Sequence, residues 1–508
     1  MRTGKSNRWL VLMSVILAFM PIVLDYTILH VAVPSLTLAL QATGTEILWI
    51  IDIYPLLMAS LLIPMGTLAD RVGHRRMLLA GLGIFCAGSI LAAFSPNVAA
   101  LIGARAFMAF GGAMIMPSVL AIIRQTFEDQ SDQAVALGIW GAVASTGAAI
   151  GPLVGGALLE HFWWGAVFLI NVPVMLLVIP LVIAWIPRRS VVGDGNWTIG
   201  QSVILILGVM ASVYALKSGF KTNSSHFVTG ACFVFGALML VWFVRKQRHT
   251  LTPMLDLSLF AIPAVSTGIV MALVTMGALA GFELLLAQEL QFVMGRTPLE
   301  AGIFMMPLMI AAAIGGPLAG VILRAIGLRW VASCSLLVSA ASLVGLAQIH
   351  LGSAGVAVIV MLVALGLSLS IGLTASSVAI MNSIPMEKAG SAGALEATSY
   401  DLGTGLGITV FGILLVSTYE KSIQLPDGIP TAIAETAVRS IGETMIAAKA
   451  LGGIQGQQLA AAGQKAFSAS HSMVLLTAAA LVGALSLLVW FVLRHHNSKS
   501  GAVSSDFE

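Results

Sequence analysis

Residues 46–95 read EILWIIDIYPLLMASLLIPMGTLADRVGHRRMLLAGLGIFCAGSILAAFS, two apolar runs separated by a charged turn. The runs at 46–66 and 77–95 each have about the 20 residues that a helix needs to cross the hydrocarbon core of a bilayer. The charges between them gather in GTLADRVGHRRML, residues 66–78. Two apolar helices joined by a short charged turn are typical of a chain that crosses a membrane repeatedly, so this stretch predicts an all-α membrane fold.

The composition of the whole chain agrees with a lipid environment. Of the 508 residues, 58% are hydrophobic and 9% are charged, whereas an ordinary soluble domain has roughly 25% charged residues. Apolar runs recur along the chain and predict fourteen spans in all. They lie at about 9–31, 46–66, 77–95, 98–123, 134–158, 165–186, 198–217, 226–245, 262–290, 299–323, 330–350, 354–381, 391–416 and 470–493.

Several classes of function are disfavoured by the residues present. The net charge of +3 is small and dispersed, which predicts no nucleic-acid partner. No metal-ligand cluster or nucleophilic triad is apparent, so we expect neither an enzyme nor a metal site. The TGKS at residues 3–6 lacks the upstream glycine of a phosphate-binding loop, which argues against transport driven by ATP. We expect no cofactor, and a proton gradient as the source of energy.

The basic residues predict the topology, because lysine and arginine are enriched in cytoplasmic loops. With fourteen spans and a cytoplasmic N-terminus, the inner segments hold most of the lysines and arginines, and both termini are cytoplasmic. The short outer loops hold Lys217, Lys221 and Arg296. One long connection, residues 417–469, lies outside. Its middle, Thr431–Leu451, reads as a polar helix or hairpin, with a mobile solvated loop as the alternative.

A weak internal repeat predicts the domain organisation. The turn at 66–78 is echoed by GPLAGVILRAIGLRWV at 316–331, eight spans later instead of six. Two six-helix halves separated by an inserted pair of helices would produce this offset, and a substrate site near the midplane between the halves is then expected. The predicted parts are a first half at 1–187, an inserted pair at 188–255, a second half at 256–495 and a cytoplasmic tail at 496–508.

Two short motifs have the composition of conformational elements. In the turn at 66–78, glycines permit a tight bend and charged side chains can bond to neighbouring helix ends; an ordinary basic loop is the alternative. In GAAIGPLVGG, residues 147–156, glycines at four-residue spacing allow close helix approach and the proline favours a kink; generic packing is the alternative. The residues concerned are Gly66, Asp70, Arg71, Gly73, Arg75, Arg76, Gly147, Gly151, Pro152, Gly155 and Gly156.

Carboxylates inside the predicted spans are the candidate proton and cation sites. A charged side chain at the centre of a membrane helix costs about 2.5–3.5 kcal/mol on insertion scales, and burial favours the protonated form of a carboxylate. The candidates are Asp25, Asp52, Glu283, Glu289, Glu396 and Asp401. A structural partner is the alternative in each case: Arg105 for Asp25 or Asp52, and Tyr400 or a backbone group for Asp401.

One arginine and six aromatic residues complete the candidate site. Arg105 is predicted to be the only basic residue inside a span, either as part of proton transfer or as a fixed counter-ion of a buried acid. Aromatic rings could face a flat organic cation through cation–π contact, although plain packing is the alternative for each ring. These residues are Tyr26, Trp49, Tyr54, Phe107, Trp140 and Tyr400.

The motifs resemble those of a known family. GTLADRVGHRRML and GAAIGPLVGG are similar to two signatures of the major facilitator superfamily. Four further segments resemble its fourteen-span branch of drug:proton antiporters, and especially the exporters of quaternary ammonium compounds and methyl viologen in Gram-negative bacteria. They are LDYTILHVAVP (24–34), WIIDIYPL (49–56), VFLINVPV (167–174) and PMLDLSLF (253–260).

The resemblance implies a function that composition and spacing alone do not give. It implies a monomeric protein of the bacterial inner membrane that exports lipophilic monocations and dications, such as quaternary ammonium biocides, dyes and methyl viologen, in exchange for protons by alternating access. In such transporters the arginine that matches Arg105 is linked to proton transfer. The alternative is a proton-coupled exporter or importer of a physiological metabolite or siderophore.

Overall fold

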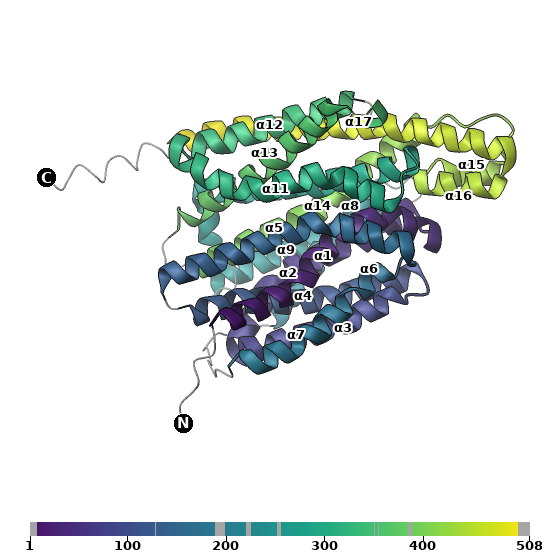
Figure 1. The fold of residues 1–508 in the computed structure, drawn as a ribbon. Helices are drawn as coiled ribbons and strands as arrows, with labels where there is room; N and C mark the ends of the chain where they lie inside the picture. Colours follow the sequence, from purple (N-terminus) through teal and green to yellow (C-terminus); the bar gives the residue numbers. More distant parts are fainter. Residues whose placement is uncertain are drawn as a thin grey trace. The chain divides into compact units, whose positions relative to one another are not determined.

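The chain folds into helices throughout the part that the computed structural model describes (Figure 1). The described residues are 8–127, 129–187, 199–219, 225–250, 256–349, 351–353, 355–384 and 389–495. Within these ranges, fourteen helical segments are long and apolar enough to cross a membrane. The predicted all-α membrane fold and its fourteen spans are therefore confirmed. The predicted tail at 496–508 and Lys221 lie outside the described residues.

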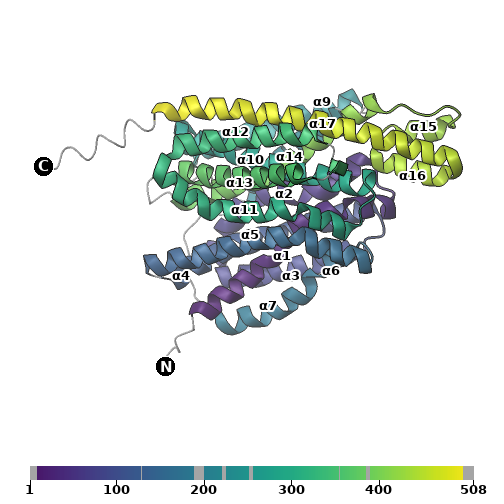
Figure 2. The same cartoon turned by 45° about the horizontal axis from the view of Figure 1, so that its top comes forward.

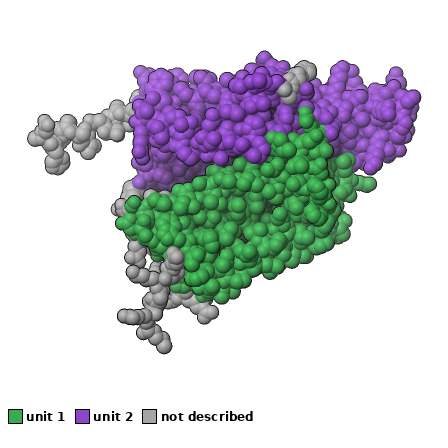
Figure 3. Space-filling view, viewed as in Figure 1, with its two compact units in different colours: residues 1–254, 296–303 green, residues 255–295, 304–508 purple. Residues whose placement is uncertain are grey.

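The helices form two compact units (Figure 3). Unit 1 consists of Met1–Met254 and Arg296–Ile303, and unit 2 of Leu255–Gly295 and Phe304–Glu508. The two helices of the predicted inserted pair belong to unit 1, where they pack on each other and the first of them packs on α2. The helices before Met254 are α1 (Arg8–Leu40), α2 (Gly44–Val72), α3 (His74–Ala93), α4 (Val98–Thr126), α5 (Gln130–His161), α6 (Ala166–Leu169), α7 (Asn171–Trp185), α8 (Ile199–Gly219) and α9 (His226–His249).

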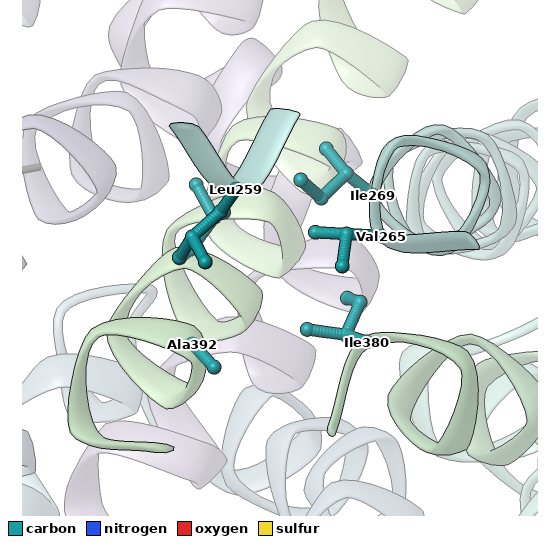
Figure 4. Close-up of a cluster of buried hydrophobic side chains, with 6 residues drawn as sticks. Leu259, Val265, Ile269, Ile380 and Ala392 are labelled. Carbon is teal, nitrogen blue, oxygen red and sulfur yellow. The ribbon is translucent and has the colours of Figure 1, made fainter. Parts of the chain in front are cut away.

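The helices after Leu255 complete the chain. They are η1 (Leu257–Ala261), α10 (Pro263–Gln288), the π-helical η2 (Glu289–Val293), α11 (Pro298–Ile326), α12 (Leu328–Gln348), η3 (Leu351–Ser353), α13 (Val356–Met381), α14 (Ala389–Ser422), α15 (Thr431–Ala437), α16 (Ile441–Leu451), α17 (Gly453–Val492) and η5 (Leu493–His495). A buried apolar cluster joins η1 and α10 to the end of α13 and the start of α14 (Figure 4). It consists of Leu259, Val265, Ile269, Ile380, Ala392 and Leu395.

The predicted outer connection at 417–469 is largely helical, which corrects the expectation of one long loop. Helix α14 continues to Ser422 and α17 already begins at Gly453. The prediction limited both spans to their apolar runs, but residues 453–469 are rich in alanine and glutamine, which favour a helix in water as well. The helical interpretation of Thr431–Leu451 is confirmed as two helices, α15 and α16.

The short helices α15 and α16 are anchored on the long last helix, beside which they lie in Figure 2. Ala437, Ala448 and Leu459 belong to one buried cluster that joins all three helices. A hydrogen bond of 2.6 Å between the hydroxyls of Tyr419 and Thr444 also ties the end of α14 to α16. This packing rules out the alternative of a solvated loop for the segment.

The internal repeat seen in the sequence is also a repeat of backbone geometry. Gly73 separates α2 from α3 with φ of 99°, and Gly327 separates α11 from α12 with φ of 82°. Residues with a side chain rarely adopt such positive φ values, so glycine is needed at both turns. Each turn is followed at once by a new helix, which starts at the next residue.

An arginine follows each of these glycines at the second position of the new helix, and both arginines bind a helix end. Arg75 donates a hydrogen bond of 2.7 Å to the carbonyl oxygen of Ile183, near the end of α7. Arg329 donates one of 3.0 Å to the carbonyl oxygen of Trp490, near the end of α17. In both cases the acceptor lies two residues before the last helical residue. We call these two contacts the arginine clamps; each satisfies a carbonyl in the last turn of a helix.

Candidate functional site

The first candidate site is a buried ion pair between α1 and α4. The Nη1 atom of Arg105 lies 3.1 Å from Oδ2 of Asp25, and the two side chains are 1% and 2% exposed. The guanidinium of Arg105 also lies 5.2 Å from the ring centre of Tyr54 and 5.8 Å from that of Phe168. Of the two acids that the sequence left open for Arg105, the structure therefore selects Asp25.

The guanidinium of Arg105 is not fully used by this pair. Its Nη2 atom donates to the carbonyl oxygen of Ile51 at 3.5 Å, at the limit of a hydrogen bond. Its buried Nε atom has no hydrogen-bond partner among the described residues. An unpaired buried donor is costly, so the guanidinium has hydrogen-bonding capacity that Asp25 does not use.

The six candidate aromatic residues do not form one group. Tyr26 contacts Tyr54 edge to face, with 5.1 Å between ring centres, beside the Asp25–Arg105 pair. Trp140 of α5 instead contacts Phe19 of α1 at 5.1 Å. Phe107 is 40% exposed, so its ring is not enclosed within the chain. The structure thus gathers two of the six predicted rings near the first acid.

Asp52 has a partner that the sequence analysis placed elsewhere. The ammonium of Lys217 lies 2.8 Å from Oδ1 and 2.7 Å from Oδ2 of Asp52, and 3.8 Å from the ring centre of Trp49. Lys217 was predicted in a short outer loop and Arg105 as the only basic residue inside a span; both predictions are wrong. Helix α8 continues to Gly219 and buries Lys217, because the carboxylate on α2 compensates for its charge.

In unit 2, the two acids of α14 have different surroundings. The hydroxyl of Tyr400 donates a hydrogen bond of 2.6 Å to Oε1 of Glu396, one helical turn earlier. Tyr400 therefore pairs with Glu396 and not with Asp401, the acid for which the sequence suggests it, because residues four apart lie on the same helix face, whereas adjacent residues do not. Asp401 itself is buried.

The two acids at the end of α10 are also buried. Glu289 stands at the start of the π-helical turn η2, where its carboxylate accepts a hydrogen bond of 2.6 Å from Ser468 and lies 3.3 Å from Nδ1 of His471. Both partners are on α17, so this carboxylate ties the end of α10 to the last helix. Glu283, two turns earlier, lies inside α10.

Sequence reasoning missed His471 as a partner of Glu289, although His471 lies within the predicted span 470–493. The signal was a polar stretch, Ser468 to Ser472, at the very start of the last apolar run. Lys217 offered a comparable signal, since it is the last residue of the apolar run at 198–217 while an acid in another span had no assigned partner. In both cases the residue lay at the edge of a predicted span, 198–217 or 470–493, and was not considered as the partner of a buried acid.

The glycine motif of α5 packs against α1. A Cβ atom placed on Gly151 would overlap the side chain of Thr27, and one placed on Gly155 would lie 3.1 Å from Ile28. Gly147, one turn before, faces Val23 in the same way. These glycines therefore allow the two helices to approach closely, as their four-residue spacing predicts. Pro152 lies within the same helix, four residues before Gly156.

In the charged turn after α2, one arginine contacts a helix end and the acid Asp70 contacts a histidine. Among its arginines, Arg75 forms a clamp, whereas Arg71 and Arg76 are exposed. The carboxylate of Asp70 lies 3.4 Å from Nε2 of His74, one turn later, and its side chain is 63% exposed. Gly66 lies close to Pro117 of α4. The arginine, and not the acid, makes the contact with a helix end.

Comparison with known proteins agrees with this architecture. Residues 15–408 match the Major Facilitator Superfamily. The chain is 44% identical over 487 residues to the methyl viologen resistance protein SmvA of Salmonella typhimurium, covering 96% of this chain and 98% of the relative. It is 34% identical over 493 residues to the multidrug efflux pump LfrA of Mycolicibacterium smegmatis, covering 94% and 96%.

A solved structure shows the same fold at low sequence identity. The crystal structure of a bacterial homologue of the human lysosomal transporter Spinster, inward-facing and unoccupied, superposes with a TM-score of 0.68. It is 18% identical in sequence and covers 97% of this chain and 98% of its own. The fourteen spans, the repeated turn and the full-length matches have one common explanation: this membrane transport protein belongs to the major facilitator superfamily.

Proposed function

We propose that the protein is a proton-driven exporter of lipophilic organic cations, both monocations and dications. The observation that carries this proposal is the Asp25–Arg105 pair, a buried carboxylate whose positive partner lies against aromatic rings. An organic cation needs the same two things, a negative charge and an aromatic face. A proton, the guanidinium and a substrate cation can therefore compete for one carboxylate.

The geometry of the pair supports such competition. Asp25 and Arg105 make a single contact of 3.1 Å, and the Nε atom of the arginine has no hydrogen-bond partner among the described residues. A carboxylate held by one contact loses less interaction energy when its partner leaves than a carboxylate held by two contacts. In our proposal, protonation of Asp25 releases a bound cation, and loss of the proton restores the site.

The relatives support the choice of cations. The relative at 44% identity is a methyl viologen resistance protein, and methyl viologen is a flat dication; the relative at 34% identity is a multidrug efflux pump. A dication exchanged for a single proton would carry net charge across the membrane. A second carboxylate that exchanges a proton removes this imbalance. Asp401 and Glu396, both buried in α14, are our candidates.

We further propose that the protein works as a monomer in the bacterial inner membrane, by alternating access, with both termini in the cytoplasm. The burial of Lys217 supports this topology, because it removes one basic residue from the predicted outer loops.

Reconstituted liposomes test the function directly. The purified protein is placed in liposomes, a pH gradient is imposed, and the movement of radiolabelled methyl viologen and of a labelled quaternary ammonium monocation is followed. We expect both cations to move against the proton flux, and a protonophore to stop them. The Asp25→Asn variant should be inactive, whereas Asp427→Asn, which alters an exposed acid, should be fully active.

Two outcomes would contradict the proposal. Cation movement that does not depend on the pH gradient would show that transport is not coupled to protons. Counterflow of a neutral metabolite or a siderophore, without any movement of either cation, would instead support the alternative of a physiological solute.

A further inference from the structure

We infer that Lys217 is a positioning residue that holds Asp52 as a permanent ion pair, docks the inserted helix pair on α2, and thereby keeps Asp52 out of proton exchange. This inference rests on the proposed function in one respect, since it assigns proton exchange to other acids. It gives a role to a buried lysine that the transport mechanism does not use.

In the Asp52–Lys217 pair, both the carboxylate and the ammonium are enclosed by other groups of the protein. The ammonium of Lys217 lies within hydrogen-bond distance of both carboxylate oxygens of Asp52, at 2.8 and 2.7 Å. The ring of Trp49 covers the ammonium, with its centre 3.8 Å from Nζ. The side chains of Asp52 and Lys217 are 0% and 2% exposed. The carboxylate is thus fully buried, and the ammonium of Lys217 contacts both of its oxygens.

The Asp25–Arg105 pair in the same unit provides the contrast. Arg105 reaches one oxygen of Asp25, at 3.1 Å, and leaves its Nε atom without a hydrogen-bond partner among the described residues. A two-oxygen contact at 2.7–2.8 Å stabilises the ionised carboxylate more than a single longer one. Of the two acids, Asp25 is therefore suited to exchange its partner, and Asp52 is suited to keep it.

The position of the pair explains what it holds. Helices α8 and α9 form the inserted pair, and α8 packs on α2. Near the start of α8, Gln201 accepts a buried hydrogen bond of 2.9 Å from Gln247 of α9. Near its end, Lys217 binds Asp52 of α2. In lipid, where apolar contacts give helices little preference for each other, buried polar contacts of this kind fix which helices associate.

A structural ion pair and a proton carrier respond differently to mutation. Removing one partner of a buried pair leaves an uncompensated charge and is strongly destabilising, whereas replacing both partners by uncharged groups of similar volume is often neutral. A proton carrier cannot be replaced in this way, because its exchangeable proton is lost in the double variant as well.

The experiment compares three variants, Asp52→Asn, Lys217→Met and the double variant, with the wild type. The thermal unfolding midpoint of the purified full-length protein is measured in detergent, and export of methyl viologen is measured in liposomes at matched protein amount. We expect each single variant to unfold several degrees below the wild type and to lose most of its export. The double variant should recover both the midpoint and the export.

The matched control is the other pair, with Asp25→Asn, Arg105→Met and their double variant. Recovery of stability without recovery of export is expected there, because the carboxylate of Asp25 is itself required.

Two results would overturn the inference. A double variant at Asp52 and Lys217 that has the wild-type midpoint but exports nothing would show that Asp52 carries protons or substrate. Single variants with the unfolding midpoint of the wild type would show that the ion pair does not hold the inserted helices on α2. A wild-type protein that moves no cation would contradict the proposed function instead, and the midpoints of the six variants would still decide whether Lys217 docks the inserted helices.

Discussion

At the scale of single residues, unit 1 contains two buried ion pairs that differ in how firmly they are held. Lys217 occupies both oxygens of Asp52, whereas Arg105 occupies one oxygen of Asp25. In each pair the positive partner also lies against an aromatic ring. An acid in a membrane span therefore does not reveal its role by depth alone, because the role depends on how its charge is compensated.

The first prediction concerns Asp25. Replacing it by asparagine keeps the volume of the side chain but removes the negative charge and the exchangeable proton that the proposed mechanism requires. We expect Asp25→Asn to lose export of monocations and dications alike, down to the level of membranes without the protein. Drug susceptibility of an efflux-deficient host, with the amount of protein checked by immunoblot, measures this.

Asp427→Asn is the control for this prediction, since that acid is exposed. Breaking the pair is also expected to destabilise the protein by about 3–5 kcal/mol, the range for removal of one partner from a buried ion pair. Asp25→Glu, which keeps the charge, should restore part of the resistance. Wild-type resistance in a well-expressed Asp25→Asn strain would show that another group binds the cations.

At the scale of helices, close packing depends on positions where no Cβ atom fits. We predict that Gly151→Ala weakens the contact of α5 with α1, because the added methyl group would overlap Thr27. Overpacking of this kind typically costs about 1–3 kcal/mol. Gly141→Ala is the matched control on the same helix, since a Cβ atom there meets nothing within 4 Å.

Thermal unfolding in detergent measures both glycine variants. We expect Gly141→Ala to be neutral or slightly stabilising, by up to about 1 kcal/mol, because alanine favours a helix more than glycine does. Equal midpoints for the two variants would mean that α1 and α5 can move apart at no cost, and that the glycine spacing has no role in their packing.

The arginine clamps support a second prediction at this scale. Arg75 and Arg329 occupy matching places after the two repeated turns and bind matching carbonyl oxygens. Arg329 also stacks on the ring of Trp490, whose centre is 3.7 Å from its Cζ atom. We therefore expect Arg75→Ala and Arg329→Ala each to destabilise the protein by roughly 1–2 kcal/mol, the larger loss being at Arg329.

Chemical unfolding followed by tryptophan fluorescence measures these losses, with Arg76→Ala as the control because Arg76 is exposed next to the first clamp. Arg329→Lys should recover only part of the loss, since lysine keeps the charge but not the flat group that stacks on the ring. A loss at Arg76 as large as at Arg75 would indicate a general effect of positive charge in the turn.

At the scale of the whole molecule, the proposed exchange of cations for protons is subject to the membrane potential. Moving one elementary charge against the membrane potential costs about 2.3 kcal/mol per 100 mV, so a dication exchanged for one proton is opposed where two protons are not. We predict that Asp401→Asn weakens resistance to dications more than resistance to monocations of similar size. Asp25→Asn should remove both.

Resistance to methyl viologen and to a quaternary ammonium monocation, compared at matched expression, tests this difference. Glu396→Gln should show the same trend more weakly, because the carboxylate of Glu396 accepts a hydrogen bond from Tyr400 within its own helix. Equal losses for the two substrate classes in Asp401→Asn would identify Asp401 as a common proton carrier or as a structural residue.

The fold class, the number of spans and the position of the repeat could all be predicted from the sequence. A run of apolar residues long enough to cross a bilayer is a local property, because each helix satisfies its own backbone in lipid. The glycines at 73 and 327 and the charged turn beside the first of them could be read in the same way. Helix ends that extend beyond the apolar runs could not be read in this way. The segment at 417–469, which is mostly helix, was therefore predicted as a loop.

The pairing of the buried charges could not be predicted from the sequence and is seen only in the folded protein. Asp52 and Lys217 are separated by 165 residues, and Asp25 and Arg105 by 80. From the sequence, two acids were possible partners of Arg105, and no partner was assigned to Lys217. Which acid each cation binds depends on which helices pack together and on how each helix is rotated about its axis. Packing among apolar helices in lipid involves many weak contacts spread over whole faces, so no short motif in the chain specifies these partners.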